Sequence, residues 1–270
     1  MSLGAIVNDL SLPVDIPDAL FSLSDKLIVI TGGGRGLGIA LTAAVLEAGG
    51  HVVCLDILKA PDAEEWAALQ KIAKHSNLEL SYRECDITNE EILEKIMDET
   101  DKDVERVGAQ LYGVVACAGV QQRILAVDYP QADFERIQRV NVIGTFLTAK
   151  HTARILIKNG VRGSIVLIAS MSGQIANRGL TCSAYNTSKA AVQQMCRSLA
   201  QEWGQYGIRI NTLSPGYIRT RKYGWLAGAL LGRLGAPEDF KAPAIFLLSA
   251  GSSFMTGADL RVDGGHCASA

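Results

Sequence analysis

Tyr185 and Lys189 are the residues of this chain whose types and spacing most directly suggest chemistry. They lie four positions apart in the helix-like run Ser183–Ala190, so their side chains share one helix face, about one turn apart. A phenol ionises near pH 10, and a neighbouring ammonium group would lower that pKa toward the range useful for acid/base catalysis. A chance pair on an ordinary helix surface is the simpler interpretation of these two residues taken alone.

A glycine-rich segment, Thr31–Gly38 with the sequence TGGGRGLG, lies between a predicted strand and a predicted helix. Glycines at such a junction let the backbone turn tightly and approach a pyrophosphate, which sits at the positive end of the helix. Because the segment opens a strand–helix–strand unit, a dinucleotide site is favoured over a plain loop. The predicted cofactor contacts here are Gly32, Gly34, Arg35, Gly36, Leu37 and Gly38.

Asp56 ends the second predicted strand, 18 positions after Gly38 (56 − 38). This is the place expected for a carboxylate that accepts hydrogen bonds from an adenosine ribose. A carboxylate there repels a 2′-phosphate, and the following Ile57 is not basic, so NAD is favoured over NADP. Arg35 could pair with a 2′-phosphate, which leaves NADP possible.

Short apolar segments alternate with helical patterns along the chain. The predicted strands are Leu27–Thr31, His51–Asp56, Glu79–Glu84, Leu111–Ala116, Gly163–Ser170, Ile208–Leu213 and Asp259–Val262. The predicted helices are Gly36–Ala48, Ala63–His75, Glu90–Val107, Asp133–Lys158, Tyr185–Gln205 and Glu238–Ser249. This alternation is typical of a parallel sheet with right-handed crossovers and helices on both faces. We predict one doubly wound α/β domain of about seven strands over residues 25–270, preceded by an N-terminal arm at residues 1–24.

Composition argues against several classes of protein. The chain has 270 residues, of which 48% are hydrophobic, enough for a sizeable core. Its formal net charge of -2 gives no reason to expect nucleic acid or an anionic membrane as a partner. The apolar runs are of strand length, the N-terminus lacks the pattern of a secretory signal, and the six cysteines show no zinc-binding spacing. A cytoplasmic protein without a metal is expected.

The motifs together resemble the short-chain dehydrogenase/reductase family across nearly all of residues 25–266. The matching stretches are TGGGRGLG at 31–38, CDIT with Asp86, ACAG at 116–119, VNVIGTF with Asn141, IVLIASMSG with Ser170, AYNTSKA with Tyr185 and Lys189, PG at 215–216 and VDGG at 262–265. The resemblance implies a Rossmann-type fold, a nicotinamide cofactor, and hydride transfer between that cofactor and a secondary alcohol or ketone. It also implies a homotetramer or homodimer that associates through long helices.

The resemblance assigns a catalytic set of Asn141, Ser170, Tyr185 and Lys189. Tyr185 would take the hydroxyl proton in oxidation and return it in reduction, while Lys189 would lower its pKa and hold the nicotinamide ribose. Ser170 would hydrogen-bond the substrate oxygen, and Asn141 would hold a water that links Lys189 to solvent. The structural alternatives are a cap for Ser170, a helix kink for Asn141 and partly buried packing for Tyr185.

Further contacts are expected where strands end, because the loops there form the ligand crevice of open α/β sheets. The expected cofactor contacts are Asp86 and Ile87 near the adenine, Ala118 and Gly119, Pro215 and Gly216, and Ile218 and Thr220 near the carboxamide. The expected substrate-facing residues are Gln121, Gln122, Met171, Cys182, Tyr217 and Trp225. This mixed polar and aromatic set permits a polyol or sugar-like substrate and equally a small apolar ketone.

Two departures from the family pattern leave alternatives open. Cys117 stands where the family usually has an asparagine that ties strands together, so an effect on stability is expected more than one on chemistry. Residues 221–232 form a shorter segment than the family's usual helical lid. The short segment favours a cofactor-binding sensor as an alternative to a redox enzyme, although Tyr185 and Lys189 argue against it. An isomerase or cyclase with structural NAD is a further alternative.

Overall fold

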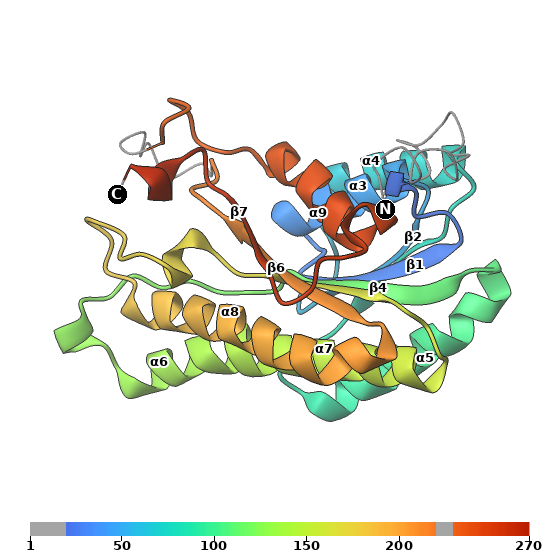
Figure 1. Cartoon of the computed structure of the whole chain (residues 1–270), viewed down its shortest axis with the longest axis horizontal. Helices are drawn as coiled ribbons and strands as arrows, with labels where there is room; N and C mark the ends of the chain where they lie inside the picture. The colour runs from blue at the N-terminus through green and yellow to red at the C-terminus, as the bar shows by residue number, and fades with distance from the viewer. Residues whose placement is uncertain (1–19, 220–228, 270) are drawn as a thin grey trace, which may run out of the picture.

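Seven short apolar segments of the chain form one parallel sheet in the computed structural model, which describes residues 20–219 and 229–269 (Figure 1). The strands follow the order β3-β2-β1-β4-β5-β6-β7, and every neighbouring pair is parallel. They are β1 (Lys26–Thr31), β2 (His51–Asp56), β3 (Leu80–Glu84), β4 (Gln110–Ala116), β5 (Ser164–Ile168), β6 (Arg209–Pro215) and β7 (Asp259–Val262). This is a doubly wound, Rossmann-type arrangement, as the sequence predicts.

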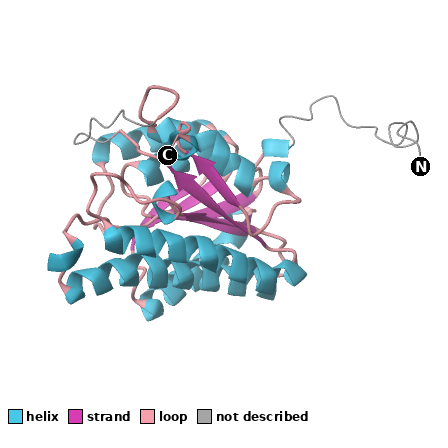
Figure 2. Cartoon of the chain, turned by 60° about the vertical axis from the view of Figure 1, so that its left-hand side comes forward, coloured by secondary structure: helices cyan, strands magenta, loops and turns pink. Residues whose placement is uncertain are grey.

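Helices cover both faces of the sheet (Figures 1 and 2). One face carries α3 (Leu37–Glu47), α4 (Ala63–His75) and α9 (Lys241–Leu248). The other carries α5 (Glu90–Val107), α7 (Thr145–Lys158) and α8 (Ser183–Trp203), with α6 (Gln131–Gln138) beside α8. None of the helices that the structure describes is long and apolar enough to cross a membrane.

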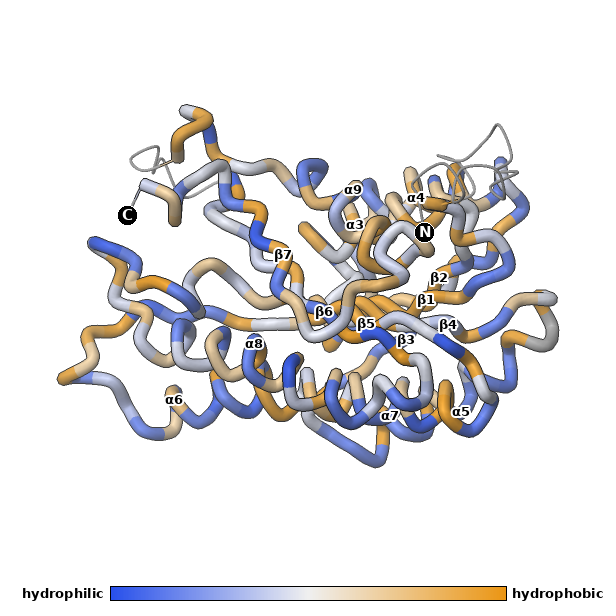
Figure 3. Tube along the Cα trace, in the orientation of Figure 1, coloured by the Kyte–Doolittle hydropathy of each residue, from blue (hydrophilic) through white to orange (hydrophobic). Residues whose placement is uncertain are grey.

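The alternating direction of side chains along each strand explains why helices must cover both faces of the sheet. In β1, Leu27 and Val29 enter the core formed with α5, α7 and α8, whereas Ile28 and Ile30 enter the core formed with α3 and α9. Successive strand residues point to opposite faces, so a run of apolar residues buries both. In Figure 3 the hydrophobic colours accordingly gather on the central strands, and the helices carry both hydrophobic and hydrophilic colours.

The predicted helix Asp133–Lys158 is wrong as one continuous element. Between α6 and α7 the chain forms a π-helical turn, Arg139–Gly144, in which Asn141 and Gly144 are buried. A side chain on Gly144 would collide with Ile87, since its Cβ would lie 2.6 Å from Ile87 Cδ1. The segment after β3 therefore comes close to the helix at the point where the helical register changes. Turns of the π type are frequent at functional sites.

The other differences are at element ends and at the edges of the described chain. Strand β5 ends at Ile168, two residues before Ser170, and α9 is preceded by a 3₁₀ turn, Pro237–Phe240. Of the predicted arm, residues 1–19 lie outside the described residues, whereas Leu23 is buried and donates its N–H to the carbonyl of Ala48.

Candidate active site

Two adjoining cavities lie at the carboxyl ends of the central strands. The first has a volume of about 310 Å³ and the second about 260 Å³. They share four wall residues: Leu37, Cys117, Gly119 and Val120. In open parallel sheets this edge, where the strand order reverses, is where ligands bind.

The glycine loop after β1 leaves room for an anion at the start of α3. Gly32 has φ 69°, and a Cβ there would lie 2.8 Å from Ala118 Cα, so both conformation and space demand glycine. A Cβ on Gly38 would lie 2.0 Å from the carbonyl oxygen of Gly32. A Cβ on Gly36, by contrast, would meet nothing within 4 Å. The loop is therefore tight against the protein on one side and open on the side where a pyrophosphate would meet the helix N-terminus.

Asp56 supports the loop from the end of β2. Its side chain is buried, with Oδ2 accepting from the backbone N–H of Gly34 at 2.9 Å and Oδ1 from that of Leu58 at 3.1 Å. Each carboxylate oxygen can accept a second hydrogen bond, so ribose hydroxyls fit beside these contacts. Arg35 is exposed at the rim of the same cavity.

The second cavity brings together most of the predicted adenosine contacts. Its walls include Gly32, Arg35, Leu37, Gly38, Asp56, Asp86, Ile87, Ala118 and Gly119. Asp86 is held in place because its Oδ1 accepts from the N–H and the hydroxyl of Thr88, at 2.9 and 2.8 Å. Gly34 and Gly36 are not wall residues of this cavity. The geometry of the loop and of these walls fits an adenine dinucleotide.

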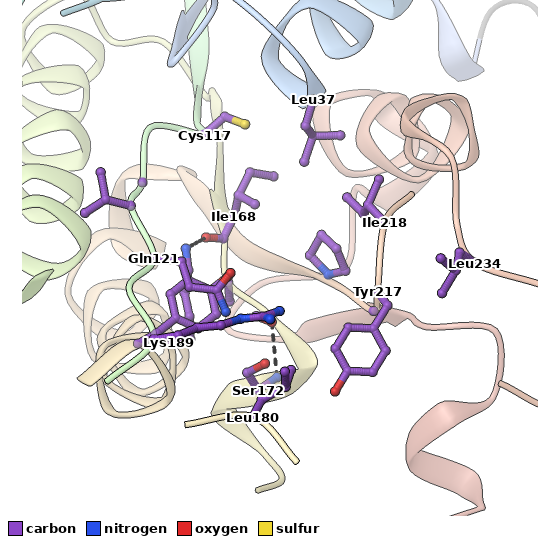
Figure 4. Close-up of a pocket in the computed structure, with 18 residues that line it drawn as sticks. Leu37, Cys117, Gln121, Ile168, Ser172, Leu180, Lys189, Tyr217, Ile218 and Leu234 are labelled. Atoms are coloured by element: carbon purple, nitrogen blue, oxygen red, sulfur yellow. Dashed lines mark hydrogen bonds between the residues drawn. The ribbon is translucent and has the colours of Figure 1, made fainter. Parts of the chain in front are cut away.

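Ser170, Tyr185 and Lys189 all line the first cavity (Figure 4). Ser170 begins a 3₁₀ turn, where its Oγ accepts from the N–H of Ser172 at 3.1 Å, so it is both a cap and a cavity residue. Tyr185 lies in the first turn of α8. Lys189 follows one turn later and donates from Nζ to the carbonyl of Ile168 at 2.7 Å, at the end of β5. Helix α8 and strand β5 therefore position three polar groups on one wall.

The pKa values at this wall correct one expectation. Lys189 Nζ lies 5.6 Å from the ring centroid of Tyr185, yet burial raises the pKa of Tyr185 to about 12, with a hydrogen bond to Ser170 acting in the opposite direction. Burial also lowers the pKa of Lys189 to about 8. In the protein alone, desolvation of the phenol is the largest influence on this pKa, so the expected lowering of the Tyr185 pKa is absent there.

Asn141 lies behind this wall, in the π-turn, with its side chain fully buried. Its Oδ1 accepts from the N–H of Val120 at 2.8 Å, and its Nδ2 donates to the carbonyl of Val120 at 2.9 Å and to Ser188 Oγ at 3.0 Å. A Cβ on Gly119 would lie 3.3 Å from Asn141 Oδ1 and 3.7 Å from Lys189 Nζ, so the two groups flank that glycine. Asn141 thus fixes the loop after β4; a bound water between it and Lys189 stays a prediction.

The predicted substrate residues fall into three groups. Gln121 and Tyr217 line the first cavity, as do the predicted nicotinamide contacts Pro215, Gly216 and Ile218. Figure 4 shows Gln121 and Lys189 on one side of the cavity and Tyr217 and Ile218 on the other. Trp225, predicted to face the substrate, and Thr220, predicted to contact the nicotinamide, lie outside the described residues.

The expectation that Met171 and Cys182 face the substrate requires correction. Both side chains are buried and neither is a cavity wall residue. Met171 follows the Ser170 cap into a turn that packs inward, and Cys182 Sγ lies 3.2 Å from Asn186 Oδ1. Gln122 is also held elsewhere, since its Oε1 accepts from Arg136 Nη2 at 2.7 Å.

Several cavity residues were not predicted from the sequence. They are Val120, Arg123, Ile168, Ala169, Ser172, Leu180 and Leu234. Ile168, Ala169 and Ser172 stand in the quoted stretch IVLIASMSG beside Ser170, which was the available signal for them. Cys117 lines both cavities, and burial raises its pKa to about 12, so it is a neutral thiol at pH 7 rather than a nucleophile. Among the described residues, no cluster of three or more His, Cys, Asp or Glu side chains could hold a metal ion.

Comparison with known proteins agrees with this fold. A family model described as Enoyl-(Acyl carrier protein) reductase matches residues 32–266. The chain is 44% identical over 263 residues to "Short chain dehydrogenases/reductase notP'" of Aspergillus versicolor, covering 92% of this chain and 89% of that protein. It is 35% identical over 267 residues to a D-arabinitol 2-dehydrogenase [ribulose-forming] of Candida tropicalis, covering 91% and 94%.

Among solved structures, the NADPH-dependent 3-quinuclidinone reductase of Rhodotorula rubra is similar, with a TM-score of 0.85 and 36% identity, covering 95% of this chain and 96% of that chain. A short-chain type dehydrogenase/reductase from Mycobacterium marinum has a TM-score of 0.84 at 35% identity, covering 92% and 97%. The chain belongs to the short-chain dehydrogenase/reductase family. It is an NAD(P)-dependent oxidoreductase.

Proposed function

We propose that this protein transfers a hydride between a nicotinamide cofactor and a secondary alcohol or ketone, with Tyr185 as the general acid/base. One observation carries the proposal: Ser170, Tyr185 and Lys189 line a cavity that adjoins the pocket of the glycine loop. A proton-transfer group and a dinucleotide site thus meet at one sheet edge.

Each side chain has a defined task in this reaction. A bound nicotinamide cofactor would accept or supply the hydride. Tyr185 takes the hydroxyl proton from the substrate in oxidation and returns it in reduction. The hydroxyl of Ser170 donates to the substrate oxygen as charge develops there. Lys189, anchored to the carbonyl of Ile168, would hold the nicotinamide ribose and keeps its ammonium group near the phenol.

NAD(H) is the proposed cofactor, on the strength of Asp56. A buried carboxylate at the end of β2 repels a 2′-phosphate and accepts from ribose hydroxyls. Arg35 at the rim is the competing influence. The names of relatives do not decide the matter: an NADH-dependent L-xylulose reductase of Ambrosiozyma monospora is 34% identical to this chain, whereas the Rhodotorula rubra reductase is named as NADPH-dependent.

The substrate class proposed is a compound with a secondary hydroxyl among other polar groups. Relatives named as D-arabinitol 2-dehydrogenase and galactitol 2-dehydrogenase, 35% and 37% identical, support secondary alcohols of this kind. Gln121, Ser172 and Tyr217 supply hydrogen-bonding groups in the cavity wall. We also propose a homodimer or homotetramer, which light scattering on the purified protein tests directly.

The test is a panel of secondary alcohols and ketones incubated with NAD, NADH, NADP and NADPH. We expect near-ultraviolet absorbance to rise with at least one alcohol as nicotinamide is reduced, and to fall with the corresponding ketone. Binding of cofactor without hydride transfer to or from any member of the panel would instead favour the non-redox alternatives.

A further inference from the structure

Ser172 presents an unpaired hydroxyl to the cavity that Ser170 and Tyr185 also line. The residue is only 7% exposed, and its Oγ forms no hydrogen bond with any described residue. This oxygen is not one of the fully enclosed, unpaired side-chain atoms of the described chain, so it is accessible from the cavity. A buried hydroxyl without a partner is unfavourable, and a polar group of a ligand is the partner that this position can receive.

The hydroxyl of Ser172 lies close to the group that would bind the reacting oxygen. The backbone N–H of Ser172 donates to Ser170 Oγ at 3.1 Å. The Oγ of a serine is about 3 Å from its own nitrogen, because three covalent bonds separate them. The two hydroxyl oxygens are therefore within about 6 Å of each other. An oxygen bound by Ser172 would belong to a carbon one or two positions from the carbon that reacts at Tyr185.

Tyr217 supplies a second hydroxyl from the opposite side of the same cavity (Figure 4). Its oxygen accepts from Asn177 Nδ2 at 3.0 Å. An amide nitrogen only donates, so the phenolic proton is not used in this bond, and no described residue accepts it. The ring of Tyr217 also makes a T-shaped contact with His266, with 5.1 Å between the ring centroids. Tyr217 is therefore held at its ring and at its oxygen, and it keeps a proton to donate.

One segment of the chain, between β5 and α8, carries the supports of both hydroxyls. It contains the 3₁₀ turn Met171–Gly173 with Ser172, and it contains Asn177, whose side chain is buried. In the view of Figure 4 the hydroxyl end of Tyr217 is turned to the part of the cavity where Ser172 and Leu180 are labelled. The hydroxyls of Ser172 and Tyr217 are thus positioned by the same piece of structure.

We infer that Ser172 and Tyr217 bind a second oxygen of the substrate, one or two carbons from the reacting carbon, so that the enzyme prefers diols and hydroxy ketones to simple alcohols and ketones. A substrate hydroxyl has a proton to donate to Ser172 and lone pairs to accept from Tyr217. Ser172 and Tyr217 are then specificity-determining residues, and Asn177 is a positioning residue that leaves the Tyr217 proton available. The inference rests on the proposed function, because it assigns a substrate feature to the same cavity.

The test compares each diol with the alcohol in which a methyl group replaces the second hydroxyl. The first pairs are 2,3-butanediol with 3-methyl-2-butanol and 2,4-pentanediol with 4-methyl-2-pentanol, followed by longer members of both series. Wild type and Ser172→Ala are assayed, with Ser198→Ala on α8 as the control, because it removes an exposed hydroxyl outside the cavity wall. We expect wild type to prefer the diol of at least one pair. In Ser172→Ala the ratio of kcat/KM for that diol to kcat/KM for its partner should fall about 5- to 50-fold, mostly through KM.

Two further variants test the donor role of Tyr217. Tyr217→Phe removes the hydroxyl, and Asn177→Asp replaces a donor by a carboxylate that accepts, so the phenolic proton turns away from the substrate. Each should lower the same ratio about 3- to 20-fold, and the double variant should lose no more than Tyr217→Phe alone. Tyr206→Phe, at an exposed position, is the matched control. A merely structural role of Asn177 would lower kcat/KM for both members of a pair and leave their ratio unchanged.

A wild-type enzyme that does not distinguish the members of any pair, or a ratio that is unchanged in Ser172→Ala or in Tyr217→Phe, would overturn the inference and leave the proposed function standing. If no pair is turned over, calorimetric binding of the same pairs in the presence of cofactor decides. Tighter binding of a diol that is lost in Ser172→Ala supports the subsite, and equal affinities contradict it. Absence of hydride transfer from every alcohol and to every ketone would count against the proposed function instead.

Discussion

Replacement of Lys189 by methionine should stabilise the cofactor-free protein at pH 7 while impairing the enzyme. The ammonium group is buried in wild type, and that burial lowers its pKa from 10.5 to about 8. Between these two values the unfolded chain binds more protons than the folded one, so this group makes stability rise with pH across that window. Below pH 8 its full cost is present, and above about pH 10.5 the cost is gone.

The size of the effect follows from two opposing contributions. A pKa of about 8 against 10.5 corresponds to about 3 kcal/mol of destabilisation at pH 7, at about 1.4 kcal/mol per tenfold change. Methionine fills much of the same volume but cannot donate to the carbonyl of Ile168, and loss of that bond costs about 1 to 2 kcal/mol. We therefore expect Lys189→Met to gain about 1 to 2 kcal/mol at pH 7 and to be less stable than wild type near pH 10.5.

Urea unfolding of wild type and variant without cofactor, at pH 7 and at several values up to pH 10.5, measures this difference. Lys71→Met on α4 is the matched control, because it makes the same change at an exposed position. A Lys189→Met protein that is less stable than wild type at pH 7, with no trend toward higher pH, would refute the reasoning about the buried charge.

Three further changes test the cofactor loop and its supports. Asp56→Ala should weaken NAD binding and narrow the preference over NADP by relieving repulsion of the 2′-phosphate; titration of both cofactors checks this, and tighter NADP binding by wild type would contradict it. Gly38→Ala should abolish cofactor binding, because its Cβ would lie 2.0 Å from the carbonyl of Gly32; retained affinity in a folded variant would show that the loop does not hold the phosphates. Asn141→Ala should lower the free energy of unfolding by about 2 to 4 kcal/mol, because it leaves the N–H and the carbonyl of Val120 unpaired. It should also reduce turnover, but less than Lys189→Met does. Urea unfolding and rate measurements on one preparation test the stability and the turnover of this variant.

The sequence predicted the fold well because its signals are local. Alternating apolar runs and helical periods mark strands and helices within a few residues, and the bounds of α4 and α5 match those expected. The loop Thr31–Gly38 was recognisable because close approach of the backbone requires glycines at neighbouring positions. Asp56 was recognisable because it is a carboxylate at the end of a predicted strand. The identity of the family then supplied Ser170 and Asn141, which no local pattern marks.

What the sequence did not predict depends on distant parts of the chain. The π-turn at Asn141 forms where the residues after β3 and β4 press against the helix, which a 3.6-residue period cannot show. Met171 and Cys182 face inward because of a local cap and of packing around α8. The raised pKa of Tyr185 in the protein alone is a consequence of burial, which the spacing between Tyr185 and Lys189 cannot show.

The most direct test of the account is turnover and cofactor affinity of Tyr185→Phe, measured on one preparation with the substrate found for wild type. The change removes only the phenolic oxygen, and the ring keeps its place in the first turn of α8. We predict a loss of about two to four powers of ten in kcat, as for other general acid/base groups, with the dissociation constant of the cofactor nearly unchanged. Turnover equal to wild type would contradict the assignment of Tyr185 as the proton-transfer group, and with it the proposed mechanism.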